Sequence, residues 1–278
     1  MNTLQDKIQE SIAFLQKAEK LALKLNPEGG FYVGFSGGKD SQVVLELCKL
    51  AGVKHTVYHN VTTNDDATTI RFIHQKYPEA RFIVPKESYF RMIEHKGLPT
   101  MLRRWCCERY KERIGAGNVV VTGVRAEESR KRAEYTEITK YVRKKSDRKE
   151  VDLDKMRDNE FQCVGGRDKF LIYPILRWTS EDVWVFINDR GLPTNPCYDK
   201  YKRVGCVFCP FSPARYIRDY IKTHPKQYQA LLHSLERYLE RSENGSQFES
   251  AEDAFEWWLS KASIKDWQDK KRQTAMKM

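Results

Sequence analysis

Apolar and polar positions alternate in blocks along the first half of the chain. From residue 3 to 25 apolar side chains recur every three or four positions, which predicts an amphipathic helix. Short and almost wholly apolar runs follow, typical of buried strands. They are "FYVGF" (31–35), "VKHTVYHNV" (53–61), "RFIVP" (81–85) and "NVVVTGV" (118–124), and helices are expected between them at 41–52, 66–77 and 88–95.

Apolar strands that alternate with helices predict an α/β fold with an open, mainly parallel sheet and helices on both faces. In such a sheet the ligand crevice lies beyond the carboxyl ends of the strands. Three polar loops fall there: "SGGKDS" (36–41), "NVTTNDD" (60–66) and "GVRAEES" (123–129). The sequence therefore predicts a site at this edge.

Later in the chain, Thr179 is placed to cap a helix with Asp182 three residues on. Beyond Pro213 the pattern becomes helical. We expect a nucleotide-binding domain at 1–212 that carries the cysteines, with a mobile basic insertion at 140–160, and a C-terminal helical region at 213–278.

Composition narrows the class of protein. The 278 residues contain no apolar run of membrane-spanning length and no secretory signal, so a cytoplasmic location is expected. A formal charge of +11 favours polyanionic partners. The densest basic run, "KYVRKKSDRK" (140–149), is either a nucleic-acid contact or a solvated surface.

The "SGGKDS" loop has the composition of a phosphate-binding turn between a strand and a helix. Gly37 and Gly38 permit a positive φ and a close approach of the backbone to a ligand. Lys39 would meet phosphate charge, and Ser36 and Ser41 supply hydroxyl groups. The Walker A spacing is absent.

This stretch, "FSGGKDS", resembles the PP-loop of the ATP pyrophosphatase family, whose members split ATP into AMP and pyrophosphate. The resemblance implies Ser36, Gly37, Gly38 and Ser41 around the β- and γ-phosphates. It also implies that Lys39 and Asp40 assist, Asp40 through Mg²⁺. Magnesium is expected chemically as well, because it neutralises charge on the departing pyrophosphate.

The seven cysteines matter through their grouping. Cys106 and Cys107 are adjacent, and Cys206 and Cys209 form a C-x-x-C pair before a proline, which indicates metal binding in a reducing compartment. Neighbouring thiolates suit an iron–sulfur cube better than one tetrahedral ion, although zinc stays open. Cys48 is expected in the core. Cys197 is either a bystander or an exchangeable thiol, and Cys163 is assigned no role.

The order C-C…C-x-x-C, with "WTSEDVWVFI" and "YDKYKRVGCVFCP" between, resembles the phosphoadenosine phosphosulfate reductase family over residues 30 to 215. Its iron–sulfur members, similar to adenylylsulfate reductases, hold a four-iron four-sulfur cluster on four such cysteines. The resemblance makes Cys106, Cys107, Cys206 and Cys209 the ligands.

The segment "TGVRAEESRKRAEY" resembles a family segment that contacts nucleotide and substrate. Arginine suits this role because its planar fork binds two phosphate oxygens and stays charged. Glu127 and Glu128 are expected to orient the arginines. The candidate residues are Gly123, Arg125, Ser129, Arg130 and Arg132, of which Arg125 and Arg130 are expected to stabilise charge at the phosphorus.

The loop after the second predicted strand lies where PP-loop relatives receive adenosine. Thr62, Asn64 and Asp65 are its candidates, although turns rich in Asn and Asp have this composition without any ligand.

Three functions remain open from the sequence. The first is an ATP-dependent enzyme that adenylates an acceptor and supports sulfur transfer with a donor or reductant protein. The second is a sulfonucleotide reductase, which the ATP-type loop and the lack of cysteine after Cys209 disfavour. The third is a non-catalytic iron–sulfur or zinc protein that binds nucleic acid.

Overall fold

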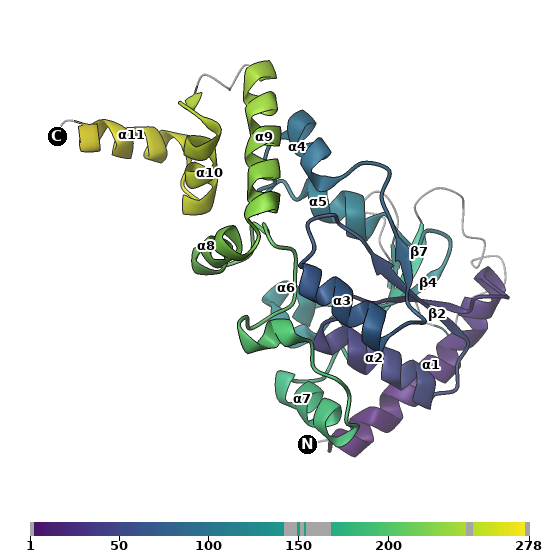
Figure 1. Ribbon diagram of the computed structural model, residues 1–278. Helices are drawn as coiled ribbons and strands as arrows, with labels where there is room; N and C mark the ends of the chain where they lie inside the picture. Colours follow the sequence, from purple (N-terminus) through teal and green to yellow (C-terminus); the bar gives the residue numbers. More distant parts are fainter. Residues whose placement is uncertain (1–2, 142–148, 151–152, 154–167, 243–246, 276–278) are drawn as a thin grey trace. The chain divides into compact units, whose positions relative to one another are not determined.

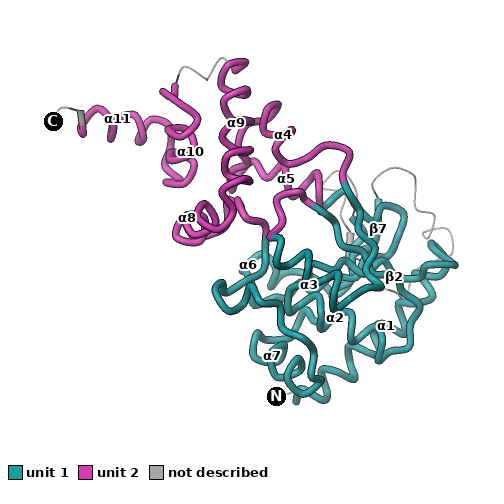
Figure 2. Tube along the Cα trace, in the orientation of Figure 1, with its two compact units in different colours: residues 1–61, 67–84, 112–205 teal, residues 62–66, 85–111, 206–278 magenta. Residues whose placement is uncertain are grey.

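The computed structural model describes residues 3–141, 149–150, 153, 168–242 and 247–275. It separates into two compact units that are interleaved along the chain (Figure 2). Unit 1 comprises residues 1–61, 67–84 and 112–205, and unit 2 comprises 62–66, 85–111 and 206–278. The expected boundary at residue 212 divides the linear chain and stays a prediction.

Unit 1 is built on a sheet to which β2, β4 and β7 belong (Figure 1). In the described part of the chain this sheet has seven strands, in the order β3-β2-β1-β4-β7-β5-β6. Five neighbouring strands are parallel, and β5 and β6 add an antiparallel edge. The strands are β1 (Phe31–Gly34), β2 (His55–Asn60), β3 (Arg81–Ile83), β4 (Val119–Val121), β5 (Ile138–Tyr141), β6 (Lys149–Glu150) and β7 (Lys169–Ile172).

Strand β1 is the point at which the strand order reverses. The chain first runs outward from β1 to β2 and β3, and then returns to place β4 on the other side of β1. Val33 accordingly pairs with Val57 of β2 and with Val121 of β4. In open α/β sheets the ligand crevice forms beyond the carboxyl ends of strands at such a switch point.

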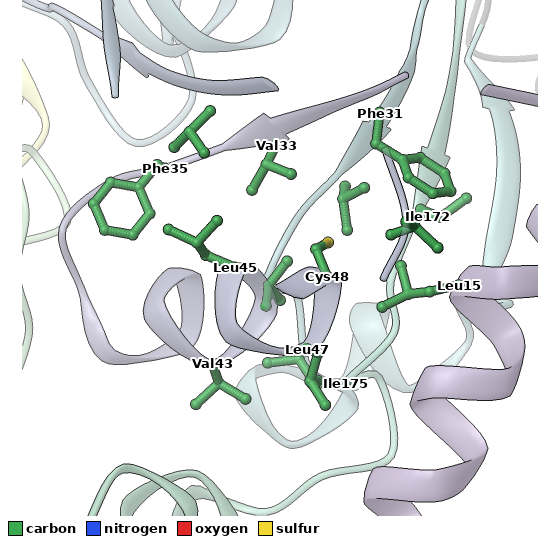
Figure 3. Packing of buried hydrophobic residues seen from close by; sticks show 14 of the residues in the cluster. Leu15, Phe31, Val33, Phe35, Val43, Leu45, Leu47, Cys48, Ile172 and Ile175 are labelled. Carbon is green, nitrogen blue, oxygen red and sulfur yellow. The ribbon is translucent and has the colours of Figure 1, made fainter. Parts of the chain in front are cut away.

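Helices pack on this sheet through one continuous apolar core. Phe31 and Val33 of β1 lie against Leu45 and Cys48 of one helix, and all four side chains are at most 1% exposed (Figure 3). Leu15, from the N-terminal helix, belongs to the same cluster. The helices of unit 1 are α1 (Leu4–Leu25), α2 (Lys39–Leu50), α3 (Ala67–Lys76), α6 (Arg130–Ala133) and α7 (Ser180–Asp189).

Unit 2 is helical. Its α4 and α9 pack together, and Glu94 of α4, with a side chain 7% exposed, pairs with Arg91 and with Arg237 of α9. Phe208 and Phe255 pack edge to face with ring centroids 6.2 Å apart. The helices are α4 (Tyr89–Lys96), α5 (Trp105–Cys107), α8 (Ala214–Thr223), α9 (Pro225–Arg241), α10 (Ala251–Ser260) and α11 (Ile264–Ala275).

The predicted fold class is confirmed, as an α/β protein with an open, mainly parallel sheet, covering helices and C-terminal helices. The strands β5 and β7 were not predicted. Most of the basic insertion expected at 140–160 lies outside the described residues. None of the helices in the described ranges is long and apolar enough to cross a membrane.

Candidate nucleotide site and cysteine cluster

The loop after β1 is a tight turn that requires glycine at position 37. Gly37 has φ +72°, in the left-handed region that favours glycine. An added Cβ would also lie 2.9 Å from Cγ1 of Ile73. The carbonyl oxygen of Gly37 accepts a hydrogen bond of 3.0 Å from Nδ2 of the fully buried Asn195. The turn is therefore fixed from outside as well as by its own conformation.

Two serine hydroxyls close the turn from within. Oγ of Ser41 donates to the carbonyl of Gly38 at 2.8 Å and accepts the N–H of Ser36 at 3.2 Å. The hydroxyl oxygens of Ser36 and Ser41 are 3.2 Å apart. Both predicted serines thus lie together at the start of α2, where backbone N–H groups have no helical carbonyl partner.

A chain of alternating charges joins this loop to the loop after β4. Oδ1 of Asp40 lies 2.8 Å from Nζ of Lys39 and 2.7 Å from Nε of Arg125. The Nη1 atom of Arg125 lies 2.6 Å from Glu127, whose carboxylate also accepts the N–H of Ser180. The structure thus brings Lys39, Asp40 and Arg125 together, and Glu127 orients Arg125 as predicted.

The same two loops touch through their backbones at Gly123. A Cβ at this position would lie 2.7 Å from the carbonyl carbon and oxygen of Asp40. Backbone atoms cannot give way as a flexible side chain can, so only glycine allows this approach. Gly123, expected from the sequence to belong to the site, is the contact by which the loop after β4 lies against the first turn of α2.

Both cations of the site, Lys39 and Arg125, have buried side chains. Lys39 has a side chain 9% exposed, and this burial lowers the pKa of its ammonium group, while the carboxylate of Asp40 opposes the change. The side chain of Arg125 is 6% exposed. Because charges act over a lower effective dielectric when buried, both cations would attract phosphate more strongly here than at the surface.

Tyr198 completes the site and was missed in the sequence. It lies on a 3₁₀ turn at Pro196–Asp199, and its hydroxyl oxygen accepts the N–H of Lys39 at 2.9 Å. Burial raises the pKa of Tyr198 to about 12, so the phenol is neutral at physiological pH. Tyr198 and Lys39 are 159 positions apart in the sequence, so no local motif indicates this contact.

The remaining candidates after β4 have different surroundings. Ser129 caps α6 by accepting the N–H of Arg132, and Arg132 is ion-paired with Glu128, which therefore orients it as predicted. Burial lowers the pKa of Arg132. Arg130 is exposed on α6. Arg125 is thus the arginine of this segment that the structure joins to the loop at 36–41.

Thr62, Asn64 and Asp65 belong to unit 2, where they hold the segment that carries Cys206. Asn64 pairs with the backbone of Phe208 in both directions, each hydrogen bond being 3.2 Å long. The N–H of Val207 adds a bond of 2.8 Å to the carbonyl of Asn64. Their predicted role toward adenosine stays a prediction, and the contacts observed are structural.

The four cysteines predicted as ligands all lie in unit 2. Cys106 and Cys107 end α5, and Cys206 and Cys209 flank Val207 and Phe208, the two residues that Asn64 holds. The side chain of Cys107 and burial raise the pKa of Cys106, and the charges of Cys206 and Cys209 raise it further. Both pairs thus belong to the same compact unit, although about 100 positions of sequence separate them.

Two further residues of unit 2 face these sulfurs. Nζ of Lys111 donates to Sγ of Cys206 at 3.5 Å, and the hydroxyl of Thr62 lies 3.6 Å from the same sulfur. Burial raises the pKa of Tyr89 well above its usual range, and the charges of Cys106, Cys206 and Cys209 act in the same direction. Lys111 was missed in the sequence, because a lysine among many carries no signal.

Comparison with known proteins now places the chain. The sequence profile of the phosphoadenosine phosphosulfate reductase domain matches residues 30–212, which include both loops of the nucleotide site and all four clustered cysteines. The chain belongs to this family. The expected resemblance is thereby confirmed for the phosphoadenosine phosphosulfate reductase domain, while the iron–sulfur type stays a prediction.

Curated relatives of this reductase-domain chain are distant. An uncharacterised protein of Methanocaldococcus jannaschii is 27% identical over 74% of this chain and 50% of its own length. Adenosine 5'-phosphosulfate reductase of Lysinibacillus sphaericus is 24% identical over 51% of this chain and 55% of its own. The chain thus spans about half the length of these curated relatives.

A solved phosphoadenylyl-sulfate reductase of Candida auris is 17% identical, with a TM-score of 0.44, over 74% of this chain and 96% of that one. An FMN adenylyltransferase of Candida glabrata is 16% identical, with a TM-score of 0.43, over 74% of this chain and 64% of that one.

The cysteine set of this family member fits an iron–sulfur cube in its chemistry. Four sulfurs from two short segments lie within one unit, and an amine and a hydroxyl group contact the sulfur of Cys206, as hydrogen-bonding groups around ligand sulfurs do. The fit is one of residue chemistry alone, because among the described residues no group of three or more His, Cys, Asp or Glu side chains is arranged to hold a metal ion.

Two of the other three cysteines belong to unit 1. Cys48 is fully buried in the core, as predicted, and burial raises its pKa to about 12. Cys197 is buried in unit 1, with its sulfur 3.4 Å from the hydroxyl oxygen of Thr69. Cys163 lies outside the described residues.

Proposed function

We propose that this protein is an ATP-dependent PP-loop enzyme that adenylates an acceptor, releases pyrophosphate and thereby prepares the acceptor for sulfur transfer. The observation that carries this proposal is the charge chain Lys39–Asp40–Arg125–Glu127 at the switch point of the sheet. It joins the glycine–serine turn to the loop after β4, and so places two buried cations beside the N-terminus of α2.

The chemistry follows from which part of ATP such a turn would hold. The start of α2 and Lys39 would bind the β- and γ-phosphates, the part that leaves. An oxygen of the acceptor attacks the α-phosphorus, and the bond to the β-phosphate oxygen breaks. The products are an acceptor–AMP ester and pyrophosphate. A thiol or persulfide then displaces AMP from the activated acceptor carbon.

Each residue has a defined task in this scheme. Arg125 would stabilise charge that develops at the phosphorus, and its pairing with Glu127 fixes the guanidinium beforehand. Lys39 exchanges its partner Asp40 for phosphate oxygens. Asp40, once released from Lys39, would bind Mg²⁺, which would neutralise charge on the triphosphate. Arg130, exposed on α6, would act on the same phosphates only from the edge of the site.

The cysteine cluster supplies the second part of the proposal. Cys106, Cys107, Cys206 and Cys209 would hold a four-iron four-sulfur cluster, which can carry sulfur or electrons or serve as a structural element. Lys111 would direct a positive charge at the sulfur of Cys206. The donor of sulfur would be a partner protein or a small thiol, and the acceptor is a small molecule, a nucleic acid or a protein.

The deciding experiment incubates anaerobically purified protein with ATP, Mg²⁺ and a panel of acceptors, and separates the nucleotide products. We expect AMP and pyrophosphate in equal amounts, and only with the right acceptor. Arg125→Ala should slow their formation by about 10²–10³-fold, the usual effect of removing a charge-stabilising donor. Lys131→Ala, on an exposed lysine of α6, is the matched control and should leave the rate unchanged.

Other products would assign another function. ADP and orthophosphate would contradict cleavage at the α-phosphate. Sulfite released from an adenylated sulfate with a thiol reductant, and without ATP, would establish a sulfonucleotide reductase. Binding of nucleic acid without any turnover of nucleotide would favour the non-catalytic alternative.

A further inference from the structure

The hydroxyl group of Tyr198 occupies a position that the phosphate loop offers to a ligand. The first turn of a helix presents N–H groups that no helical carbonyl can accept. At the start of α2 the N–H of Lys39 is one of these groups, and the phenolic oxygen of Tyr198 accepts it at 2.9 Å. A protein oxygen thus sits among the donors that would bind phosphate.

The loop is built to let this side chain approach. A Cβ at Gly38 would lie 3.3 Å from the hydroxyl oxygen of Tyr198, closer than most such contacts, so a larger residue would push the ring away. The ring itself is fixed by Trp184 of α7, with centroids 5.1 Å apart and planes at 79°. Asn195, three residues earlier in the chain, anchors the same segment to the carbonyl of Gly37.

We propose that Tyr198 is a further ligand of the nucleotide, whose oxygen keeps the N–H of Lys39 while its proton is donated to an oxygen of the pyrophosphate moiety. This inference rests on the proposed function, since it assigns a residue to the same phosphate site. The class of ligand is any pyrophosphate-bearing anion, and ATP and inorganic pyrophosphate are its two testable sources.

The hydrogen-bonding capacity of Tyr198 favours a hydroxyl group that binds the phosphate over one that the phosphate must displace from the N–H of Lys39. A phenol has one proton to donate beyond the bond that it accepts from Lys39. Because the phenol stays neutral at physiological pH, it would not repel phosphate as a phenolate would. Trp184 and Asn195 hold the segment on both sides, so that the hydroxyl group is already in place before the anion arrives.

The test compares two variants that each remove one phenolic oxygen bonded to α2. Tyr198→Phe removes the proposed ligand. Tyr77→Phe is the matched control, because the hydroxyl of Tyr77 accepts from Nε2 of Gln42 at 2.6 Å within the core and not at the loop. Binding of ATP, inorganic pyrophosphate and AMP is measured by calorimetry, at a temperature where near-ultraviolet circular dichroism shows both variants folded.

We expect Tyr198→Phe to weaken ATP and pyrophosphate binding by roughly 10-fold or more, as for loss of a hydrogen bond to a charged group, and to leave AMP unchanged. Tyr77→Phe should alter none of the three affinities. Unchanged or tighter binding of pyrophosphate by Tyr198→Phe would overturn the inference. Tighter binding would mean that the hydroxyl group competes with the anion for the N–H of Lys39. A wild-type protein that binds neither ATP nor pyrophosphate would overturn this inference and the proposed function together.

Discussion

Lys39 links the electrostatics of the site to a measurable pH dependence. Its pKa lies below the usual lysine range because the side chain is buried. Only the protonated amine attracts the triphosphate, so affinity for ATP is complete below this pKa and is lost as the pH rises through it. We therefore expect calorimetric titrations to show ATP binding that weakens at a lower alkaline pH than an ordinary lysine would give.

Lys39→Arg provides the control for this pH profile. A guanidinium stays charged over the whole range, so its ATP affinity should not fall where that of the wild type does. AMP, which lacks the β- and γ-phosphates, should show little dependence on pH in either protein. Identical alkaline profiles for ATP in wild type and Lys39→Arg would show that Lys39 does not bind the phosphates.

At the level of single residues, local motifs explain what the sequence could predict. Gly37, Lys39 and Asp40 are neighbours in one loop, and their combination already indicated phosphate chemistry. Tyr198 carries no such local signal, because its partner is 159 positions away. Thr62 has a contact that the sequence did not indicate, because its hydroxyl group lies 3.6 Å from the sulfur of Cys206.

Among the elements, the segment that carries Cys206 and Cys209 depends on Asn64. Asn64→Ala would leave the N–H of Phe208 without its partner in the interior, which costs about 1–3 kcal/mol. We expect this segment to open more often, so that Cys206 and Cys209 react faster with iodoacetamide in anaerobic protein. Peptide mass spectrometry after timed alkylation measures the two rates.

Asn60→Ala is the matched control for this element. Asn60 also makes a side-chain hydrogen bond, from the hydroxyl of Tyr32 at 2.8 Å, but it lies in the sheet of unit 1. The Asn60→Ala variant should therefore have alkylation rates of Cys206 and Cys209 near those of the wild type. Equal acceleration by both Asn variants would attribute the effect to general destabilisation.

Among the later elements, the capped helix α7 was predicted correctly, and the short strands β5 and β7 were missed. Thr179 and Asp182 form the predicted capping box of α7, with both reciprocal hydrogen bonds present. Strand β7 is only four residues long and follows a polar stretch, so no alternation could develop in it. Strand β5 includes Lys140, at the start of the basic run, so its sequence did not indicate a strand.

For the whole molecule, the metal content of the purified protein tests whether the four cysteines hold an iron–sulfur cluster. Four thiolates on one cube predict about four irons in each chain when the protein is purified without oxygen. Replacing Cys106, Cys107, Cys206 or Cys209 by Ser should in each case lower the iron content. Iron and acid-labile sulfide analyses measure it directly.

Cys48→Ala is the control for the cysteine variants, because this buried thiol packs in the core of unit 1 and should not affect iron. Stoichiometric zinc without iron in anaerobic protein would contradict the iron–sulfur assignment.

The organisation of the whole chain exceeded what sequence patterns could predict. The helical pattern beyond Pro213 was evident, but the units are discontinuous: residues 62–66 and 85–111 pack with the C-terminal segment. A linear boundary at 212 cannot express such interleaving, because packing partners are set by the fold and not by proximity in sequence. The net charge of +11 is likewise a property of the whole chain and does not indicate which part of the surface is basic.

The discontinuity of unit 2 has a consequence for how the protein is made. Cys106 and Cys107 are synthesised about 100 residues before Cys206, so at roughly 5–20 residues per second they wait on the order of 5–20 s for their partners. During that interval the ribosome-bound chain contains only two of the four predicted ligands, Cys106 and Cys107. Any cluster on all four cysteines must therefore be inserted late, after the sequence of unit 1 has been completed.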